Sequence, residues 1–182
     1  MKKVPFIFFF TALAHIGFAQ IYMTRSGQIS FFSKTPLENI EGTNNEVTSL
    51  LDAGKGEVVF AVLIKSFHFD RALMEEHFNE NYLESSKFPK STFQGKINNL
   101  ASIDFKKDGV FPAEVEGDLT IHGVKQHVVT KGTITVSGGK VSATTNFIIK
   151  LADYKVEIPS LVADKISETL EIRVSCKYQP KS

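Results

Sequence analysis

The chain has 182 residues, enough for one domain with a sizeable hydrophobic core. Its 21 basic and 20 acidic residues nearly balance, so it lacks the basic excess of nucleic-acid-binding proteins and any polybasic cluster for anionic membrane surfaces. Cys176 is the only cysteine, which excludes an intramolecular disulfide. The domain must therefore depend on its core for stability.

Residues 1–19 have the pattern of a secretory signal peptide. Two lysines precede an apolar stretch over residues 4–18, and Gly17 and Ala19 place small side chains at the −3 and −1 positions of a cleavage site. An uncleaved membrane anchor is the alternative, but an apolar run of about 15 residues is shorter than the roughly 20 that span a bilayer. No cysteine follows the run, which argues against a lipid-anchored protein. We expect cleavage after Ala19, one domain over residues 20–182 and a periplasmic or secreted location.

Alternation of apolar and polar side chains predicts that most of the domain is β-strand. The clearest alternation covers residues 113–121, where apolar residues alternate with charged ones, as in an antiparallel sheet wetted on one side. Similar patterns predict strands over residues 29–34, 47–51, 57–67, 88–97, 113–121, 128–136, 140–151 and 169–178. Residues 40–46 are expected to be irregular or bulged. Gly138 and Gly139 predict a tight hairpin turn.

One amphipathic helix interrupts the strands. Asp70 is expected to cap it, and Arg71 and Glu75, four residues apart, are expected to pair. Helical spacing predicts a buried face made of Leu73, Met74, His77, Phe78 and Tyr82. A second, short helix is expected near residues 162–166.

Consecutive strands with short connections and one apolar face form either a sandwich or a barrel. Closure into a barrel removes exposed sheet edges. We therefore predict an all-β fold with small helical additions, an antiparallel up-and-down β-barrel of about eight strands. A barrel of this size has room for its own side chains or for one elongated ligand.

Two segments resemble hallmarks of the YceI-like family of bacterial envelope proteins. The first contains Tyr82, the pair Phe88-Pro89 and Phe93, and the second, GDLTIHGVKQHV, covers residues 117–128. The order of strands and inserted helix is also similar. The resemblance implies a lipocalin-like barrel whose interior holds a polyisoprenoid or related lipid chain, such as a quinone tail. The chain differs from the family pattern at two further segments, residues 72–77 and 150–154, which bear on the ligand more than on the fold.

The inner faces of the strands are the candidate ligand site. Small residues leave volume on these faces, and an apolar chain gains about 0.8 kcal/mol for each CH₂ that it buries; the small residues are Ala113, Gly117, Gly132, Ala143 and Thr145. The predicted lining residues are Phe31, Phe60, Val62, Ile64, Phe78, Tyr82, Phe93, Ile97, Val115, Leu119, Ile134, Phe147 and Ile149. Tyr82 or Tyr154 is expected at the mouth, near any headgroup. The alternative is a barrel filled by its own side chains.

Other residues that could carry chemistry do not form a recognisable motif. His68, His77, His122 and His127 lack the spacing of metal ligands, and turn or surface positions are expected for them. Cys176 falls on an apolar strand face, where a thiol is inert, and Glu114 and Glu116 fall on a solvated face. We expect no metal site, no cofactor beyond a bound isoprenoid or quinone lipid, and no catalysis.

The expected function is to bind and carry or store a long apolar lipid in the bacterial envelope, with at most transient membrane contact and no nucleic-acid partner. Two alternatives remain open: a filled barrel that acts as an interaction or stress-protection module, and an enzyme that acts on a lipid headgroup. The sequence leaves the oligomeric state undetermined.

Overall fold

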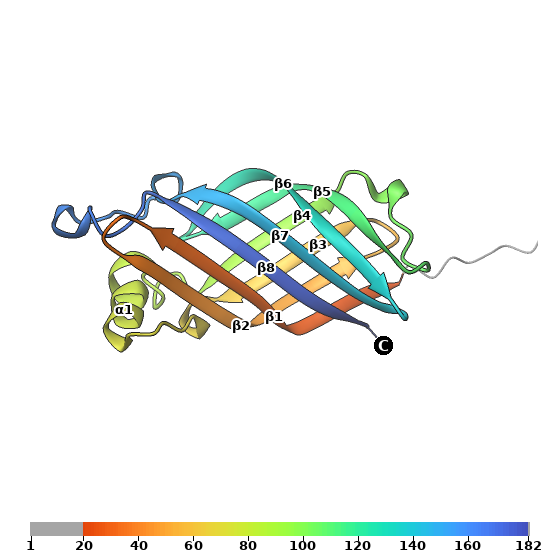
Figure 1. The fold of residues 1–182 in the computed structure, drawn as a ribbon, viewed down its shortest axis with the longest axis horizontal. Helices are drawn as coiled ribbons and strands as arrows, with labels where there is room; N and C mark the ends of the chain where they lie inside the picture. Colours follow the sequence, from red (N-terminus) through yellow and green to blue (C-terminus); the bar gives the residue numbers. More distant parts are fainter. Residues whose placement is uncertain (1–19, 182) are drawn as a thin grey trace, which may run out of the picture.

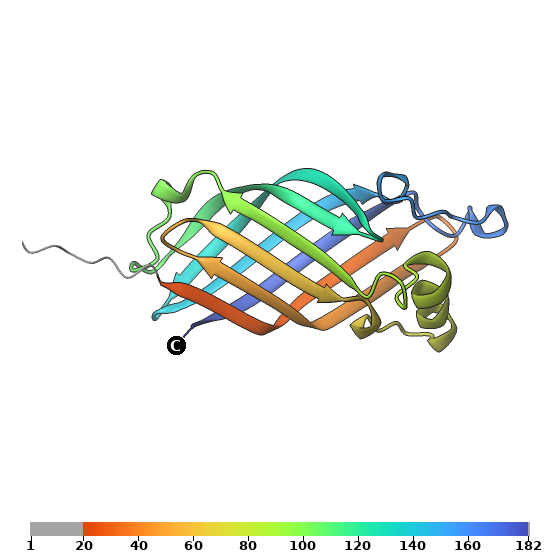
Figure 2. The same cartoon turned by 180° about the vertical axis from the view of Figure 1, so that it is seen from behind.

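The computed structural model describes residues 20–181, and they form a closed antiparallel barrel of eight strands (Figures 1 and 2). Each strand pairs with the next along the chain, and the last pairs with the first, which confirms the predicted up-and-down barrel. The predicted signal peptide lies outside the described residues. The strands are β1 (Ile21–Lys34), β2 (Asn39–Asp52), β3 (Glu57–Leu63), β4 (Lys90–Ile97), β5 (Gly109–Ile121), β6 (Val124–Ser137), β7 (Lys140–Lys150) and β8 (Thr169–Pro180).

Alternation sets the inner and outer faces of the later strands as predicted. Ala113 of β5 and Ile134 of β6 point inward and are each 3% exposed, and Ile134 lies opposite Ala143 of β7. On the outer face, Glu114 lies directly opposite Lys131, a cross-strand pair of opposite charge that favours this register. A shift of one residue would turn the apolar side chains into water, so the pattern fixes the register.

Strands β1 and β2 are longer than their sequence pattern suggested. Residues 40–46 belong to β2, and the expected bulge is present there: the register of β1 with β2 shifts first between Thr24 and Gly27 and again opposite Asn44–Val47, where β2 carries the extra residue. The bulge brings polar side chains inward and so breaks the apolar alternation. Asn44 is completely buried, where its Nδ2 donates to the carbonyl of Leu63 (2.8 Å) and its Oδ1 accepts from the N–H of Glu46 (2.8 Å).

The inserted helical segment is shorter than predicted. It consists of a 3₁₀ turn η1 (Ile64–Ser66), the helix α1 (Ala72–His77) and a π-helical turn η2 (Phe78–Tyr82). The prediction that Asp70 caps the helix was wrong: Arg71 is the N-cap residue and makes no side-chain capping bond. Arg71 also pairs with Glu38 of the β1–β2 turn and not with Glu75, since Arg71 precedes the helix. The predicted buried face reduces to Phe78, because the helix lies over the end of the barrel rather than along its side.

The short helix predicted near residues 162–166 is only a single 3₁₀ turn, which lies slightly earlier, at Ser160–Val162. The segment between β7 and β8 forms two 3₁₀ turns, η4 (Leu151–Tyr154) and η5 (Ser160–Val162), and Pro159 precedes the second. The buried apolar residues of this segment all precede Pro159. They are Leu151, Tyr154 and Val156, which pack against the barrel. This segment and α1 lie at the same end of the barrel (Figure 1). No helix within residues 20–181 has the length and apolar character needed to cross a bilayer.

The opposite end of the barrel is filled by side chains. An apolar cluster that includes Ile97, Val136 and Val141 closes it, and residues of the β4–β5 connection pack against the cluster from outside. Within it, the hydroxyls of Tyr178 and Ser49 form a buried hydrogen bond of 2.8 Å. A buried hydroxyl pair of this kind keeps both polar groups satisfied away from water. The two ends of the barrel therefore differ, one closed by packed side chains and the other covered by helices and loops.

The thiol of Cys176 belongs to the filled end and is predicted to be unreactive in the folded protein. It is 1% exposed, and burial raises its pKa to about 11. At pH 8 the thiol therefore stays protonated as well as inaccessible. A thiol-specific reagent such as Ellman's reagent should leave the native protein unmodified and label it fully in denaturant. Rapid labelling of the native protein would contradict this packing.

Candidate functional site

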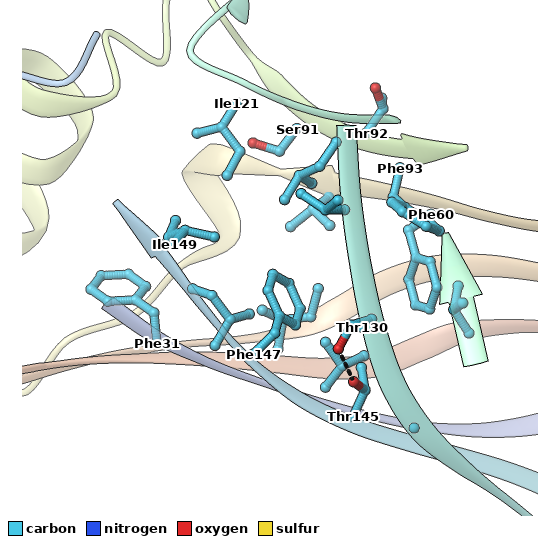
Figure 3. A pocket seen from close by; sticks show the side chains of 18 of the residues that line it. Phe31, Phe60, Ser91, Thr92, Phe93, Ile121, Thr130, Thr145, Phe147 and Ile149 are labelled. Carbon is cyan, nitrogen blue, oxygen red and sulfur yellow. Dashed lines mark hydrogen bonds between the residues drawn. The ribbon is translucent and has the colours of Figure 1, made fainter. Parts of the chain in front are cut away.

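The barrel encloses a cavity of about 200 Å³, whose wall is almost entirely apolar (Figure 3). Every strand contributes side chains to it, from Ile29 of β1 to Val174 of β8. Every predicted lining residue except Tyr82 lines this cavity, namely Phe31, Phe60, Val62, Ile64, Phe78, Phe93, Ile97, Val115, Leu119, Ile134, Phe147 and Ile149. That these residues contact a ligand stays a prediction.

Two of the hydroxyl groups in the cavity wall, those of Thr130 and Thr145, are bonded to each other. Thr130 Oγ1 and Thr145 Oγ1 lie 3.2 Å apart (Figure 3), and Thr145 also donates to the carbonyl of Lys131 at 2.8 Å. The hydroxyls of these two threonines are therefore satisfied within the protein. The cavity is suited to a molecule without polar atoms along its length.

Small residues do leave volume in the wall, with one exception. Ala113, Gly132, Ala143 and Thr145 line the cavity as the alternation indicated. Gly117 does not, because it lies opposite Gly95 where β4 and β5 approach closely, and a Cβ there would collide with backbone atoms of β4. Its role is to allow this approach rather than to widen the cavity.

A second cavity, of about 330 Å³, lies outside the barrel between α1, η2 and the segment after η4. We call it the outer cavity. Tyr82 lines it, so the structure separates this residue from the other predicted ones. Six apolar side chains line both cavities and form a neck between them, namely Phe31, Phe78, Leu83, Leu151, Val156 and Leu170.

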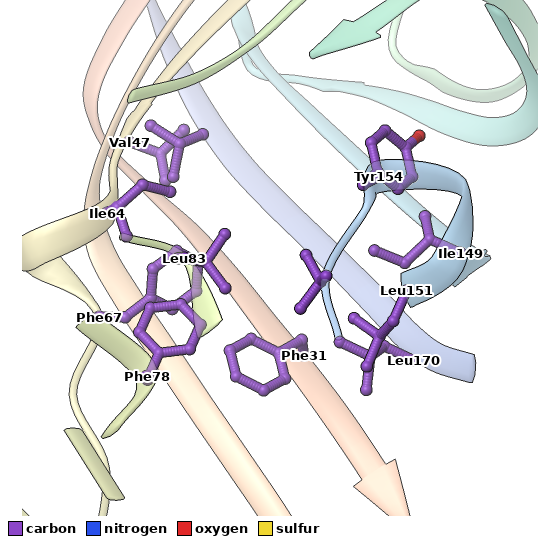
Figure 4. Close-up of a cluster of buried hydrophobic side chains, with 12 residues drawn as sticks. Phe31, Val47, Ile64, Phe67, Phe78, Leu83, Ile149, Leu151, Tyr154 and Leu170 are labelled. Atoms are coloured by element: carbon purple, nitrogen blue, oxygen red, sulfur yellow. The ribbon is translucent and has the colours of Figure 1, made fainter. Parts of the chain in front are cut away.

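Two neck residues, Phe31 and Phe78, belong to a cluster of aromatic rings with Phe67 and Phe69. The rings of Phe31 and Phe78 stack with centroids 5.4 Å apart, and Phe67 lies 5.6 Å from Phe31 and 5.4 Å from Phe78. Figure 4 shows these rings facing Leu151 and Leu170 from the opposite side of the barrel. The β1 strand and the helical segment thus meet the β7–β8 connection at this point. Any chain passing between the cavities must displace these side chains.

Several lining residues were missing from the sequence prediction. Three of them lie in strands whose apolar and polar residues alternate, and this alternation could have placed them on the inner face. They are Ile29, Ile172 and Val174. Leu83, Leu151 and Val156 come from turns and loops, where no periodicity indicates which side chains point inward. Tyr154, expected at the mouth, is 2% exposed and forms part of the barrel cavity wall, and burial raises the pKa of its phenol.

His68, His77, His122 and His127 occupy turn and surface positions, and residues 20–181 contain no group of three His, Cys, Asp or Glu side chains that could hold a metal ion. His122 holds the β5–β6 turn: its φ is +50°, its Nε2 lies 2.7 Å from Glu84 Oε2, and its ring meets Phe88 edge-on with centroids 4.7 Å apart. Positive φ is unfavourable for residues other than glycine, so these contacts are needed to keep the turn in place.

The contact between Glu84 and His122 is expected to weaken at acid pH, when the Glu84 carboxyl becomes protonated. The hydrogen bond with His122, aided by Lys87, holds the pKa of the Glu84 carboxyl below its usual value. A carboxyl group with a lowered folded-state pKa stabilises the fold above its unfolded pKa of about 4.3 and loses that effect as the pH falls through the folded value. We expect Glu84→Gln to lower Tm at pH 6, and the difference from the unsubstituted protein to be smaller at pH 3. An equal difference in Tm at both pH values would contradict this role.

Comparison with known proteins agrees with this architecture. The family model for the YceI-like domain matches residues 21–178. No curated protein matches the chain.

Solved structures with the same fold include proteins from three bacteria. A polyisoprenoid binding domain from Saccharophagus degradans, implicated in plant cell wall breakdown, aligns with a TM-score of 0.78 at 15% identity over 88% of this chain and 98% of its own. Burkholderia cenocepacia BcnA gives a TM-score of 0.68 at 17% identity over 84% of this chain and 96% of its own. The YceI protein of Campylobacter jejuni gives 0.56 at 18% identity over 78% and 84%. At these identities the likeness establishes the fold, and the family match covers nearly the whole described barrel. The chain therefore belongs to the YceI-like family.

Proposed function

We propose that the barrel binds the chain of an isoprenoid-type lipid, such as the tail of a quinone, and carries or stores it in the bacterial envelope without changing it chemically. The observation that carries this proposal is the cavity itself: about 200 Å³ inside a closed barrel, with an almost entirely apolar wall and, among residues 20–181, no charged side chain lining it. The polyisoprenoid binding described for the Saccharophagus degradans domain supports the same class of ligand.

Burial of apolar surface is sufficient to drive such binding. Each buried CH₂ contributes about 0.8 kcal/mol, so one five-carbon isoprene unit contributes roughly 4 kcal/mol before the costs of association. Those costs are about 4–15 kcal/mol, so three or four units can offset them without a charged contact. The cavity also argues against the alternative of a barrel filled by its own side chains.

Extraction of the purified protein tests the proposal. Protein purified without detergent is extracted with organic solvent, and the extract is analysed by mass spectrometry and quantified per mole of protein. We expect close to one polyprenyl or prenylquinone chain per protein, and rebinding of a prenylquinone by the extracted protein. A protein that yields no lipid and binds neither a prenylquinone nor a fluorescent hydrophobic probe would overturn the proposal.

The envelope location has a separate test. We propose that the chain is exported and cleaved after Ala19, as its basic and apolar N-terminal pattern indicates. Fractionation followed by N-terminal sequencing should recover a protein that begins at Gln20 outside the cytoplasm. Recovery of the uncleaved chain in the cytoplasmic fraction would contradict this location.

A further inference from the structure

We propose that the outer cavity is a headgroup site, which takes an anionic group rich in hydrogen-bond acceptors, such as a phosphate, at the end of the apolar chain. This inference rests on the proposed function, because it assigns the two ends of one ligand to the two cavities. The chain would lie in the barrel, pass the neck between Phe31 and Phe78, and end in the outer cavity.

The outer cavity gathers polar side chains that include charged groups, which the described wall of the barrel cavity lacks. They come from β1, the β1–β2 turn, the residue before α1, α1 itself, η2 and the segment after η5. In that order they are Ser33, Glu38, Arg71, His77, Tyr82 and Lys165. The remaining wall is apolar and includes the six neck residues. Among the described residues, an amphiphilic molecule thus meets charged side chains only at this end.

These polar side chains carry an excess of hydrogen-bond donors. Glu38 is the only carboxylate among them, and Arg71 already pairs with it. The guanidinium has five N–H donors, so most remain available after this pairing. Ser33 Oγ accepts the N–H of Ser167 at 2.8 Å, which leaves its O–H free to donate. The free capacity of the cavity therefore suits a ligand that accepts hydrogen bonds.

The charges of the cavity point the same way. Arg71 and Glu38 cancel, and within residues 20–181 Lys165 forms no ion pair, so the lining carries one uncompensated positive charge. Asp70 and Asp164 neighbour these cations in sequence but do not line the cavity. Burial raises the pKa of Tyr82, which keeps its phenol neutral and able to donate. A phosphate would meet a cation and several donors at once, an arrangement that favours charge-assisted hydrogen bonds.

Two ligands with the same chain separate this inference from the proposed function. Geranylgeranyl phosphate and geranylgeraniol are titrated into the delipidated protein, with Lys165→Gln as the test variant. Lys177→Gln is the control, because Lys177 is exposed on the outer face of β8, near the opposite end of the barrel. We expect the phosphate to bind about tenfold more tightly than the alcohol, as one or two charge-assisted hydrogen bonds contribute. Lys165→Gln should remove most of that difference and leave the alcohol unchanged, whereas Lys177→Gln should alter neither.

The other outcomes each exclude a different statement. Equal affinity for the two ligands, or a phosphate preference that Lys165→Gln does not reduce, overturns the headgroup site and leaves the apolar chain site intact. Tight binding of inorganic phosphate alone also overturns it, because the cavity would then be a site for free anions. Failure of both ligands to bind would overturn the proposed function itself.

Discussion

Replacement of Ala143 by phenylalanine is expected to weaken lipid binding by about 50-fold. Ala143 lines the barrel cavity on β7, opposite Ile134 and Cys176, so a larger side chain there projects into the space proposed for the ligand. A phenyl ring that displaces about three methylenes removes about 2.4 kcal/mol of burial, which corresponds to that change in affinity. Titration of a prenylquinone into the delipidated variant measures the effect.

Asn146→Phe is the matched control for this prediction. Asn146 lies on the same strand, three residues away, and its side chain is exposed on the outer face. The same bulky group at that position should leave affinity unchanged. If both variants bind like the unsubstituted protein, the ligand does not occupy the barrel interior.

Replacement of Gly117 by alanine is expected to lower the free energy of unfolding by about 3 kcal/mol. A Cβ at this position would collide with the carbonyl oxygen of Gln94 and the Cα of Gly95, which belong to the backbone of the neighbouring strand. Backbone atoms in a closed barrel cannot move aside without breaking the ladder between β4 and β5. For a domain of this size the change corresponds to a fall in Tm of about 9 °C, measurable by calorimetry.

Gly109→Ala distinguishes this collision from a general effect of glycine replacement. Gly109 begins the same strand, and the nearest atom to a Cβ there would be the tip of the Phe111 ring, at 3.0 Å. A side-chain tip can move, so the change in stability should stay within about 0.5 kcal/mol. Equal destabilisation by both substitutions would show that close approach of β4 and β5 is not the cause.

The later strands could be predicted from the sequence because one periodic signal governs them. In β5, β7 and β8 most apolar side chains alternate and point into the barrel, although Val110 of β5 and Ile148 of β7 are exposed on the outer face. The same reasoning failed in β1 and β2, where the bulge at Gly27 changes the register and buried polar residues such as Asn44 take inner positions. Their hydrogen bonds depend on strands far away in sequence, which no local pattern contains.

The candidate site likewise has a part that the sequence pattern predicted and a part that it did not. Strand residues that line the barrel cavity followed from alternation, whereas the outer cavity did not. That cavity is made by segments without periodicity, and Leu73, predicted to be buried by helical spacing, is 61% exposed. The α1 helix is too short to present a continuous apolar face, so Phe78 alone reaches the interior. Where a helix ends and which loop folds over it are set by tertiary contacts.

The filled end of the barrel has a consequence for the selection of ligands by size. With Tyr178 and Ser49 bonded at that end and an apolar cluster packed around them, the proposed lipid chain would enter from the side of the neck. A cavity that is closed at one end would select chains by length. A chain that is too short would leave empty space, and one that is too long would force its head out of the outer cavity. The same geometry fixes a direction of travel, since the part of the molecule that goes in last is the first to come out. A membrane or protein that receives the lipid would therefore meet its head before its tail.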